Sequence, residues 1–174
     1  MNFRLYAAED FDQLYALEVL CFKPPFRFSR RSMRAFVEHL HSATWIAEEN
    51  GQIAGFAIVE WSVRKDESRA YIQTIEVAPE ARRRSVAREL LGHIEGSARD
   101  AGAASIWLHV DARNASAIRL YEAQGYRCQG RKENFYPQGR SGLLYMKCLD
   151  ADGSGVPFDD VAATAGTARA ATNR

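Results

Sequence analysis

In the second half of the chain, patterns typical of strands alternate with patterns typical of helices. A strand pattern at residues 71–77 is followed by a helical pattern from Ser85, an apolar run at 105–110 and a second helical pattern at 114–124. Two neighbouring strands that are joined by a helix lie parallel, because the crossover returns the chain to the same end of the sheet. The apolar run at 105–110 is typical of a central strand covered on both faces. This order predicts an α/β fold with at least one parallel pair.

The first half predicts antiparallel strands and two helices. Asn50-Gly51, between two apolar runs, is typical of a type I′ hairpin. Asp10 and Gln13 match a capping box, and Leu40 is expected to lie inward at the end of the second helix. The expected strands are residues 2–6, 44–48, 53–63, 71–77, 105–110, 126–131 and 143–149, and the expected helices are 10–21, 29–40, 85–101 and 114–124. The prediction is a mixed sheet with an antiparallel N-terminal half and a parallel central pair, in the order β-α-α-β-β-β-α-β-α-β-β.

The composition of the 174-residue chain is typical of one globular domain, expected at residues 1–149, with a flexible C-terminal tail at 150–174. Lys plus Arg is 23 and Asp plus Glu is 22, a net charge of +1 that argues against bulk nucleic-acid binding. Three widely spaced cysteines favour neither disulfides nor a metal site. No signal peptide or membrane span is recognisable. We expect a cytoplasmic monomer or homodimer with no metal, no nucleic acid and no membrane partner.

The segment from Val77 to Arg88 carries the strongest functional signal. A strand ends, a short loop with Arg82, Arg83 and Arg84 follows, and a helix begins. Free amides in the first turn and the helix dipole favour anions, and arginine can hold phosphate oxygens through two hydrogen bonds. A solvated basic loop is the alternative interpretation. RNA binding is disfavoured, because no second basic cluster accompanies aromatic residues.

This segment resembles the signature of the GNAT acetyltransferase superfamily, which is Arg or Gln, two residues, Gly, one residue, then Gly or Ala. Arg82, Ser85 and Ala87 occupy the three fixed positions, with Ser85 in place of the usual glycine. A Cβ is tolerated there if φ is negative, so we expect reduced tolerance rather than lost cofactor binding. The block from Asn114 to Tyr126 also matches, and the resemblance covers residues 2–149.

Within the superfamily, the chain is most similar to the amino-terminal protein acetyltransferases, the RimI-type bacterial enzymes and their eukaryotic relatives. The similarity lies at residues 71–74 (YIQT), 107–110 (WLHV) and 134–136 (NFY). RimI-type enzymes usually have glutamate where this chain has His109, whereas a eukaryotic branch has histidine there and tyrosine at the position of Tyr71. The resemblance implies direct transfer of an acetyl group from acetyl-CoA to a protein or peptide N-terminus.

This chemistry needs a neutral amine, a stabilised oxyanion and a proton for the leaving thiol. A free α-amine has a pKa near ~8, so about a tenth of it is neutral at pH 7 and a weak base suffices. His109 suits that role, with Tyr71 holding a water, and the resemblance makes Tyr121 the proton donor to the thiolate. Glu76 is a second candidate base, ranked lower because strict alternation puts it on the opposite face from Tyr71.

The resemblance also implies which residues hold the two substrates. Backbone amides at the start of the helix would hold the cofactor pyrophosphate, and an amide between Ile75 and Val77 would stabilise the oxyanion. Asn114 would cap its helix and contact the pantetheine arm. The expected cofactor-binding residues are Ile75, Val77, Arg82, Arg83, Arg84, Ser85, Val86, Ala87, Arg88, Asn114 and Tyr121.

The acceptor is expected to lie between two loops, residues 22–28 and 135–138. Phe26 would pack against the first side chains of a peptide, and Tyr136 would bond its backbone, with Phe135 beside them. A satellite core is the alternative role for these aromatic residues. Other acceptors, a lysine side chain or a small-molecule amine, stay open, as does a non-catalytic acyl-CoA-binding module.

Overall fold

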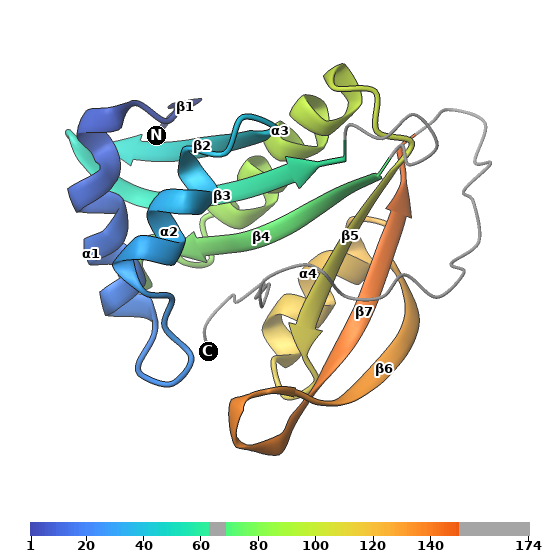
Figure 1. Cartoon of the computed structure of the whole chain (residues 1–174). Helices are drawn as coiled ribbons and strands as arrows, with labels where there is room; N and C mark the ends of the chain where they lie inside the picture. Colours follow the sequence, from blue (N-terminus) through green and yellow to red (C-terminus); the bar gives the residue numbers. More distant parts are fainter. Residues whose placement is uncertain (63–68, 150–174) are drawn as a thin grey trace.

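The computed structural model describes residues 1–62 and 69–149 and contains one seven-stranded mixed sheet (Figure 1). The strand order is β1-β2-β3-β4-β5-β7-β6, with α1 and α2 on one face and α3 and α4 on the other. The strands are β1 (Asn2–Leu5), β2 (Ser42–Glu49), β3 (Gln52–Trp61), β4 (Arg69–Val77), β5 (Ser105–Asp111), β6 (Arg127–Tyr136) and β7 (Arg140–Cys148). The helices are α1 (Phe11–Cys21), α2 (Arg30–Val37), α3 (Val86–Asp100) and α4 (Ala115–Ala123). The mixed sheet and the order of elements are confirmed.

Two predictions fall on residues that the structure leaves out. The C-terminal tail at 150–174 and most of the charged connection at 64–69 lie outside the described residues. Within the described ranges, no helix is long and apolar enough to cross a bilayer.

The parallel pair is formed by β4 and β5, and only at the start of each strand. Three residue pairs join them, the last being Tyr71 with Trp107. Beyond that pair the strands separate (Figure 1), while β4 stays paired with β3 and β5 with β7. We call residues 72–77 and 108–111 the β4–β5 divergence. Within it the described strands have no backbone pairing with each other.

A β-bulge interrupts β4 at Gln73. Ile72 pairs with Val59 of β3, and the next pair joins Thr74 to Ile58, so Gln73 is an extra residue. An extra residue shifts the alternation of side chains between the two faces. Every face assignment along β4 beyond Gln73 is therefore opposite to that expected from strict alternation.

The bulge places Glu76 on the same face as Tyr71. Their partners on β3, Phe56 and Glu60, are four residues apart on a regular stretch and share a face. Glu76 is fully buried on the side of α1, where its carboxyl group interacts with Glu18. The expectation that Glu76 faces away from Tyr71 is wrong, because it assumed an unbroken strand.

The helices cover the sheet largely as their patterns predict. Phe11, Leu14, Leu17 and Cys21 of α1 are buried, and α1 ends before the Lys23-Pro24-Pro25 segment. On the opposite face, the apolar side of α3 is buried against β2, β3 and β4. These two layers form the core that positions β4.

Three local predictions in the front half and the closing strands are wrong. Asp10 makes no capping bond to α1; its carboxylate accepts from Arg4 at 2.7 and 2.8 Å and from the Ala7 amide at 2.8 Å. Leu40 is 85% exposed, because α2 ends at Val37. Strand β6 extends to Tyr136, so the aromatic residues expected in a loop lie at the end of a strand.

Candidate active site

Tyr71 and His109 meet where β4 and β5 begin to separate. Tyr71 Oη and His109 Nδ1 are 2.6 Å apart, and the phenol oxygen also accepts the His109 backbone N–H at 3.2 Å. The two strands bring together residues 38 positions apart in the sequence. The direct contact agrees with the predicted pairing of these side chains, although the sequence-based scheme placed water beside Tyr71. Their catalytic roles stay a prediction.

Burial sets the protonation states of this pair. It lowers the pKa of His109 to about 4, and Lys132 adds a smaller effect in the same direction. The His109 ring is therefore neutral at pH 7, the form in which a nitrogen can accept a proton. Burial raises the pKa of Tyr71, so the phenol keeps its proton. The ring of Phe135 stacks on His109 with centroids 4.0 Å apart and covers it.

Tyr121 of α4 supplies a buried hydroxyl near this pair. The side chain is fully buried, and its Oη has no hydrogen-bond partner among the described residues. A buried polar atom without a partner costs about 1–3 kcal/mol, so a ligand group that bonds to this hydroxyl would recover that free energy. Burial raises the pKa of Tyr121, which keeps the hydroxyl protonated and able to donate. These properties suit a proton donor to a leaving thiolate.

The turn that enters α3 has the form of an anion site. Arg83 and Ser85 have positive φ of 59° and 63°, and α3 begins at Val86. Within the described residues, the Ser85 side chain caps none of the first-turn amides, which include those of Val86, Ala87 and Arg88. These amides remain donors for a phosphate oxygen.

The backbone at Ser85 contradicts one expectation. The Cβ was to be tolerated with a negative φ, but Ser85 is in the left-handed region that favours glycine. Ser85 thus has the backbone conformation that glycine usually adopts at this position, and its Cβ makes that conformation strained.

The arginines of this turn point in different directions. Arg84 forms a bidentate ion pair with Glu49 at the end of β2, with distances of 2.8 and 2.6 Å. Arg82 Nε donates to the Val77 carbonyl oxygen at 3.2 Å, and Arg88 pairs with Glu89 at 3.3 Å. The structure therefore gathers the predicted backbone amides at one place but does not gather all the predicted guanidinium groups there.

Asn114 caps α4, as predicted. Its Oδ1 accepts the Ala117 N–H at 3.1 Å. Its predicted contact with the pantetheine arm stays a prediction, as does the oxyanion amide between Ile75 and Val77. These two residues lie in the β4–β5 divergence, where backbone groups of β4 are not paired with β5.

The aromatic residues predicted to contact the acceptor come from two segments of the chain. The Arg140 guanidinium lies 4.7 Å from the centroid of the Phe26 ring and forms an ion pair with Asp111 at the end of β5. Phe135 packs edge-on against Tyr136, with centroids 4.9 Å apart. Arg140 thus links the segment of Phe26 to the sheet, a contact with no signal in the sequence.

Three buried polar residues lie beside the site; Glu76 was predicted only as a second candidate base, and Glu18 and Gln73 were assigned no role. Glu18 Oε1 accepts the Phe28 N–H at 2.5 Å, and Glu76 lies next to Glu18. Burial, and then Glu18, raise the pKa of Glu76 well above its ordinary value. Gln73 lies on the bulge and donates to Glu60 at 2.8 Å. A correct register for β3 and β4 would have found Glu60, which lies opposite Tyr71.

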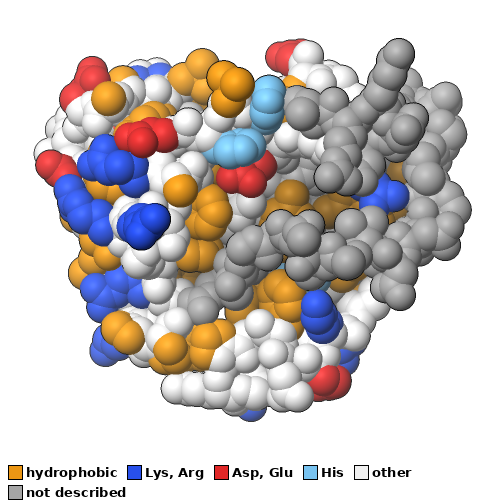
Figure 2. All heavy atoms as spheres, in the orientation of Figure 1, with side chains coloured by type: hydrophobic (Ala, Val, Ile, Leu, Met, Phe, Trp, Pro, Cys, Tyr) orange, Lys and Arg blue, Asp and Glu red, His pale blue; other side chains and the backbone are white. Residues whose placement is uncertain are grey.

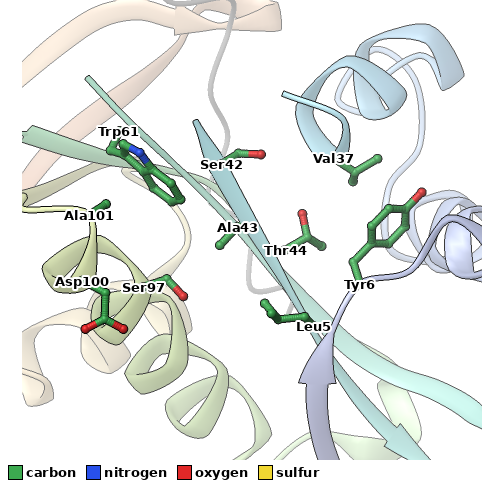
Figure 3. Close-up of a pocket in the computed structure, with 10 residues that line it drawn as sticks. All are labelled: Leu5, Tyr6, Val37, Ser42, Ala43, Thr44, Trp61, Ser97, Asp100 and Ala101. Carbon is green, nitrogen blue, oxygen red and sulfur yellow. The ribbon is translucent and has the colours of Figure 1, made fainter. Parts of the chain in front are cut away.

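Two other surface features lie away from this site. A pocket of 510 Å³ lies where β1 leaves the edge of β2, and none of the predicted site residues lines it (Figure 3). Basic side chains gather over α1 and α2 (Figure 2). Among them, the Arg30 and Arg34 guanidinium groups lie 4.9 and 3.9 Å from the centroid of the Phe11 ring, so these exposed side chains also pack against α1.

Comparisons with sequences of known proteins give a consistent family. The ribosomal protein bS18-alanine N-acetyltransferase of Escherichia coli (strain K12) is 37% identical over 100 residues, which cover 56% of this chain and 65% of that enzyme. Streptothricin acetyltransferase of Streptomyces lavendulae is 37% identical over 114 residues, 63% of this chain and 59% of that protein. The matched region thus spans less than two thirds of either relative.

Solved structures share the fold over most of the chain. The crystal structure of the ribosomal-protein-S18-alanine N-acetyltransferase from Escherichia coli matches with a TM-score of 0.77 and 24% identity, covering 90% of this chain and 99% of that one. Arabidopsis thaliana NAA60 in complex with acetyl-CoA matches with a TM-score of 0.73 and 24% identity, covering 84% and 97%. The model of the acetyltransferase (GNAT) family matches residues 11–126. The chain therefore belongs to the GNAT acetyltransferase family.

Proposed function

We propose that this protein transfers the acetyl group of acetyl-CoA directly to the α-amine of a protein or peptide N-terminus. The observation that carries the proposal is the 2.6 Å contact between Tyr71 Oη and His109 Nδ1 at the point where β4 and β5 separate. It places a neutral imidazole and a protonated phenol side by side at the mouth of the β4–β5 divergence. The proposed cellular location is the cytoplasm.

The described residues fit acetyl-CoA at two places. The uncapped first-turn amides of α3 suit a pyrophosphate, and the buried Tyr121 hydroxyl without a described partner suits a thiol sulfur. Acetyl-CoA supplies an acetyl group activated as a thioester. Val86, Ala87 and Arg88 would hold the phosphates through their backbone N–H groups, and the backbone of β4 between Ile75 and Val77 would donate to the carbonyl oxygen.

Proton movements follow from the protonation states. An α-amine with a pKa near ~8 is partly neutral at pH 7, so it needs only a weak base. His109, neutral and bonded to Tyr71, accepts the proton that the amine loses, directly or through the Tyr71 hydroxyl. Tyr121 gives its proton to the departing sulfur and recovers one from solvent. Each step uses the protonation state in which burial holds the residue.

Two observations support an N-terminal acceptor. The first is the 37% identity over 100 residues between this chain and an enzyme whose name specifies an alanine of ribosomal protein bS18. The Tyr71–His109 pair is a weak base and suits an amine of modest pKa better than a lysine amine, whose pKa of ~10.4 leaves less than about one part in a thousand neutral at pH 7.

A small-molecule amine is the second candidate acceptor. It is favoured by the 37% identity to streptothricin acetyltransferase, which covers a slightly longer part of this chain. The two candidates differ in what surrounds the amine, since a peptide continues into a backbone that Tyr136 and the segment of Phe26 would contact.

The test is mass spectrometry of acceptors incubated with the protein and acetyl-CoA. The panel holds peptides with a free N-terminus and no lysine, N-terminally blocked peptides with lysine, and small amines including streptothricin. We expect acetylation on the α-amine of the first group and little on the others. The Tyr121→Phe variant controls for non-enzymatic acetylation. Exclusive modification of blocked lysine peptides or of small amines would overturn the N-terminal acceptor.

A further inference from the structure

Gln73 is a buried polar side chain that the proposed chemistry does not use. It is 3% exposed and is the extra residue of the β4 bulge. Its Nε2 donates to Glu60 Oε2 at 2.8 Å, whereas its Oε1 is buried with no hydrogen-bond partner among the described residues. A carboxylate can only accept, so the amide nitrogen must face Glu60 and the carbonyl oxygen must face elsewhere. Gln73 therefore presents a fixed acceptor.

This acceptor lies beside the Tyr71–His109 pair. Glu60 pairs with Tyr71 across β3 and β4, and paired residues have Cβ atoms about 4.5–5.5 Å apart on one face. Gln73 follows Tyr71 by two residues on β4, a distance of roughly 6–7 Å along the strand. The amide of Gln73 thus lies within one side-chain length of the place where the acceptor nitrogen meets Tyr71.

The position of Gln73 along β4 determines which part of an acceptor peptide would lie near its side chain. It is the second residue after the last β4–β5 pair and so lies in the β4–β5 divergence. Its bond to Glu60, which shares a face with Tyr71 and Glu76, brings its amide group to that face. A peptide whose α-amine lies at Tyr71 carries its first side chain two bonds from that amine. With the α-amine at Tyr71, that side chain would be the part of the acceptor nearest to Gln73.

We propose that Gln73 Oε1 accepts a hydrogen bond from the side chain of the first acceptor residue and so selects serine or threonine over alanine, valine and methionine. This inference rests on the proposed N-terminal acceptor. An apolar first side chain leaves the buried oxygen without a donor. A hydroxyl in the same place satisfies it, and a site built to bond a hydroxyl rejects the analogue that lacks it.

The test compares peptides that differ only in their first residue. Threonine and valine have similar shapes and differ in the hydroxyl, so their ratio of kcat/KM isolates the hydrogen bond. We expect threonine to exceed valine by about 10- to 100-fold, the range that corresponds to one unsatisfied buried acceptor. The kcat/KM of a peptide that begins with serine is likewise expected to exceed that of a peptide that begins with alanine.

Two variants connect the selectivity to Gln73. Gln73→Met keeps the length of the side chain without a strong acceptor, and we expect the threonine-to-valine ratio to fall to about one, through loss of rate on threonine and gain on valine. Glu60→Gln tests the orientation of Gln73: its amide can donate to Gln73 Oε1 as well as accept from Nε2, so the ratio should fall, though less than in Gln73→Met. Circular dichroism and the Kd for CoA check that both variants are folded.

The outcomes separate this inference from the proposed function. Equal rates on threonine and valine peptides with the unmodified protein would refute the role of Gln73 and leave N-terminal acetylation standing. A threonine preference that survives in Gln73→Met would also refute it. If no peptide is acetylated on its α-amine, the proposed function and this inference both fail. The threonine-to-valine ratio of kcat/KM for the unmodified protein can refute the inference even if Gln73→Met does not fold.

Discussion

Replacing Ser85 by glycine should stabilise the protein. Ser85 has a φ of +63°, in the left-handed region where a Cβ crowds the backbone. That conformation costs an L-residue about 1–2 kcal/mol. Glycine avoids this cost but loses about 0.5–1 kcal/mol more conformational free energy on folding. The middle values of these two ranges differ by about 0.75 kcal/mol, so we expect a net gain of about 0.5–1 kcal/mol for Ser85→Gly.

Thermal unfolding followed by circular dichroism measures this gain. A domain of this size shifts its Tm by about 2–4 °C for each kcal/mol, so Ser85→Gly should raise Tm by roughly 1–4 °C. Ser85→Ala is the matched control, because it removes the hydroxyl but keeps the Cβ, and it should bring no gain. Arg83→Gly, at a φ of +59°, should bring a similar gain.

The same substitution tests the anion site. Glycine allows a closer approach of phosphate oxygens to the turn, so calorimetry should find a lower Kd for CoA with Ser85→Gly than with Ser85→Ala. The reasoning fails if Ser85→Gly has an unchanged or lower Tm. It also fails if Ser85→Ala stabilises the protein as much as Ser85→Gly does.

Three further predictions concern the site and its support. Tyr121→Phe should lower kcat by about 100-fold or more with little change in the Kd for CoA, and a loss confined to that Kd would contradict the proton-donor role. His109 is neutral above its pKa of about 4, so kcat at saturating peptide should fall as the pH drops through that value. In His109→Ala this acidic fall in kcat should be absent, and an unchanged fall would remove His109 from the mechanism. Gly55→Ala should lower the free energy of unfolding by about 1–3 kcal/mol, because its Cβ would lie 2.7 Å from the Glu76 carbonyl oxygen. The control is Gly92→Ala on α3, whose Cβ would meet no described atom within 4 Å and which should stabilise the protein when compared by urea denaturation.

Much of the architecture could be predicted because it depends on local patterns. The run at 105–110 is apolar on both faces and became β5, a central strand between β4 and β7. Asn50-Gly51 adopts the positive φ values, 53° and 74°, that a type I′ turn requires. The pairing of Tyr71 with His109 came from a resemblance to known enzymes, because residues on separate strands have no local signal that joins them.

The parts that could not be predicted depend on single residues or on distant contacts. One extra residue at Gln73 reverses the faces of β4, yet no dipeptide marks it. The positive φ of Ser85 is imposed by the turn into α3, whereas serine itself prefers negative φ. The ion pair of Arg84 with Glu49 joins residues 35 positions apart and withdraws one cation from the expected cluster.

The separation of β4 from β5 divides the sheet into two blocks, one built on β1 to β4 and the other on β5, β7 and β6. Three residue pairs and the Tyr71–His109 bond join the two blocks within the sheet. A molecule that contacts the unpaired edges of both β4 and β5 would hold the two blocks together as well as occupy a binding site. Hydrogen–deuterium exchange should then slow along residues 72–77 and 108–111 together when CoA binds, even at amides that CoA does not touch.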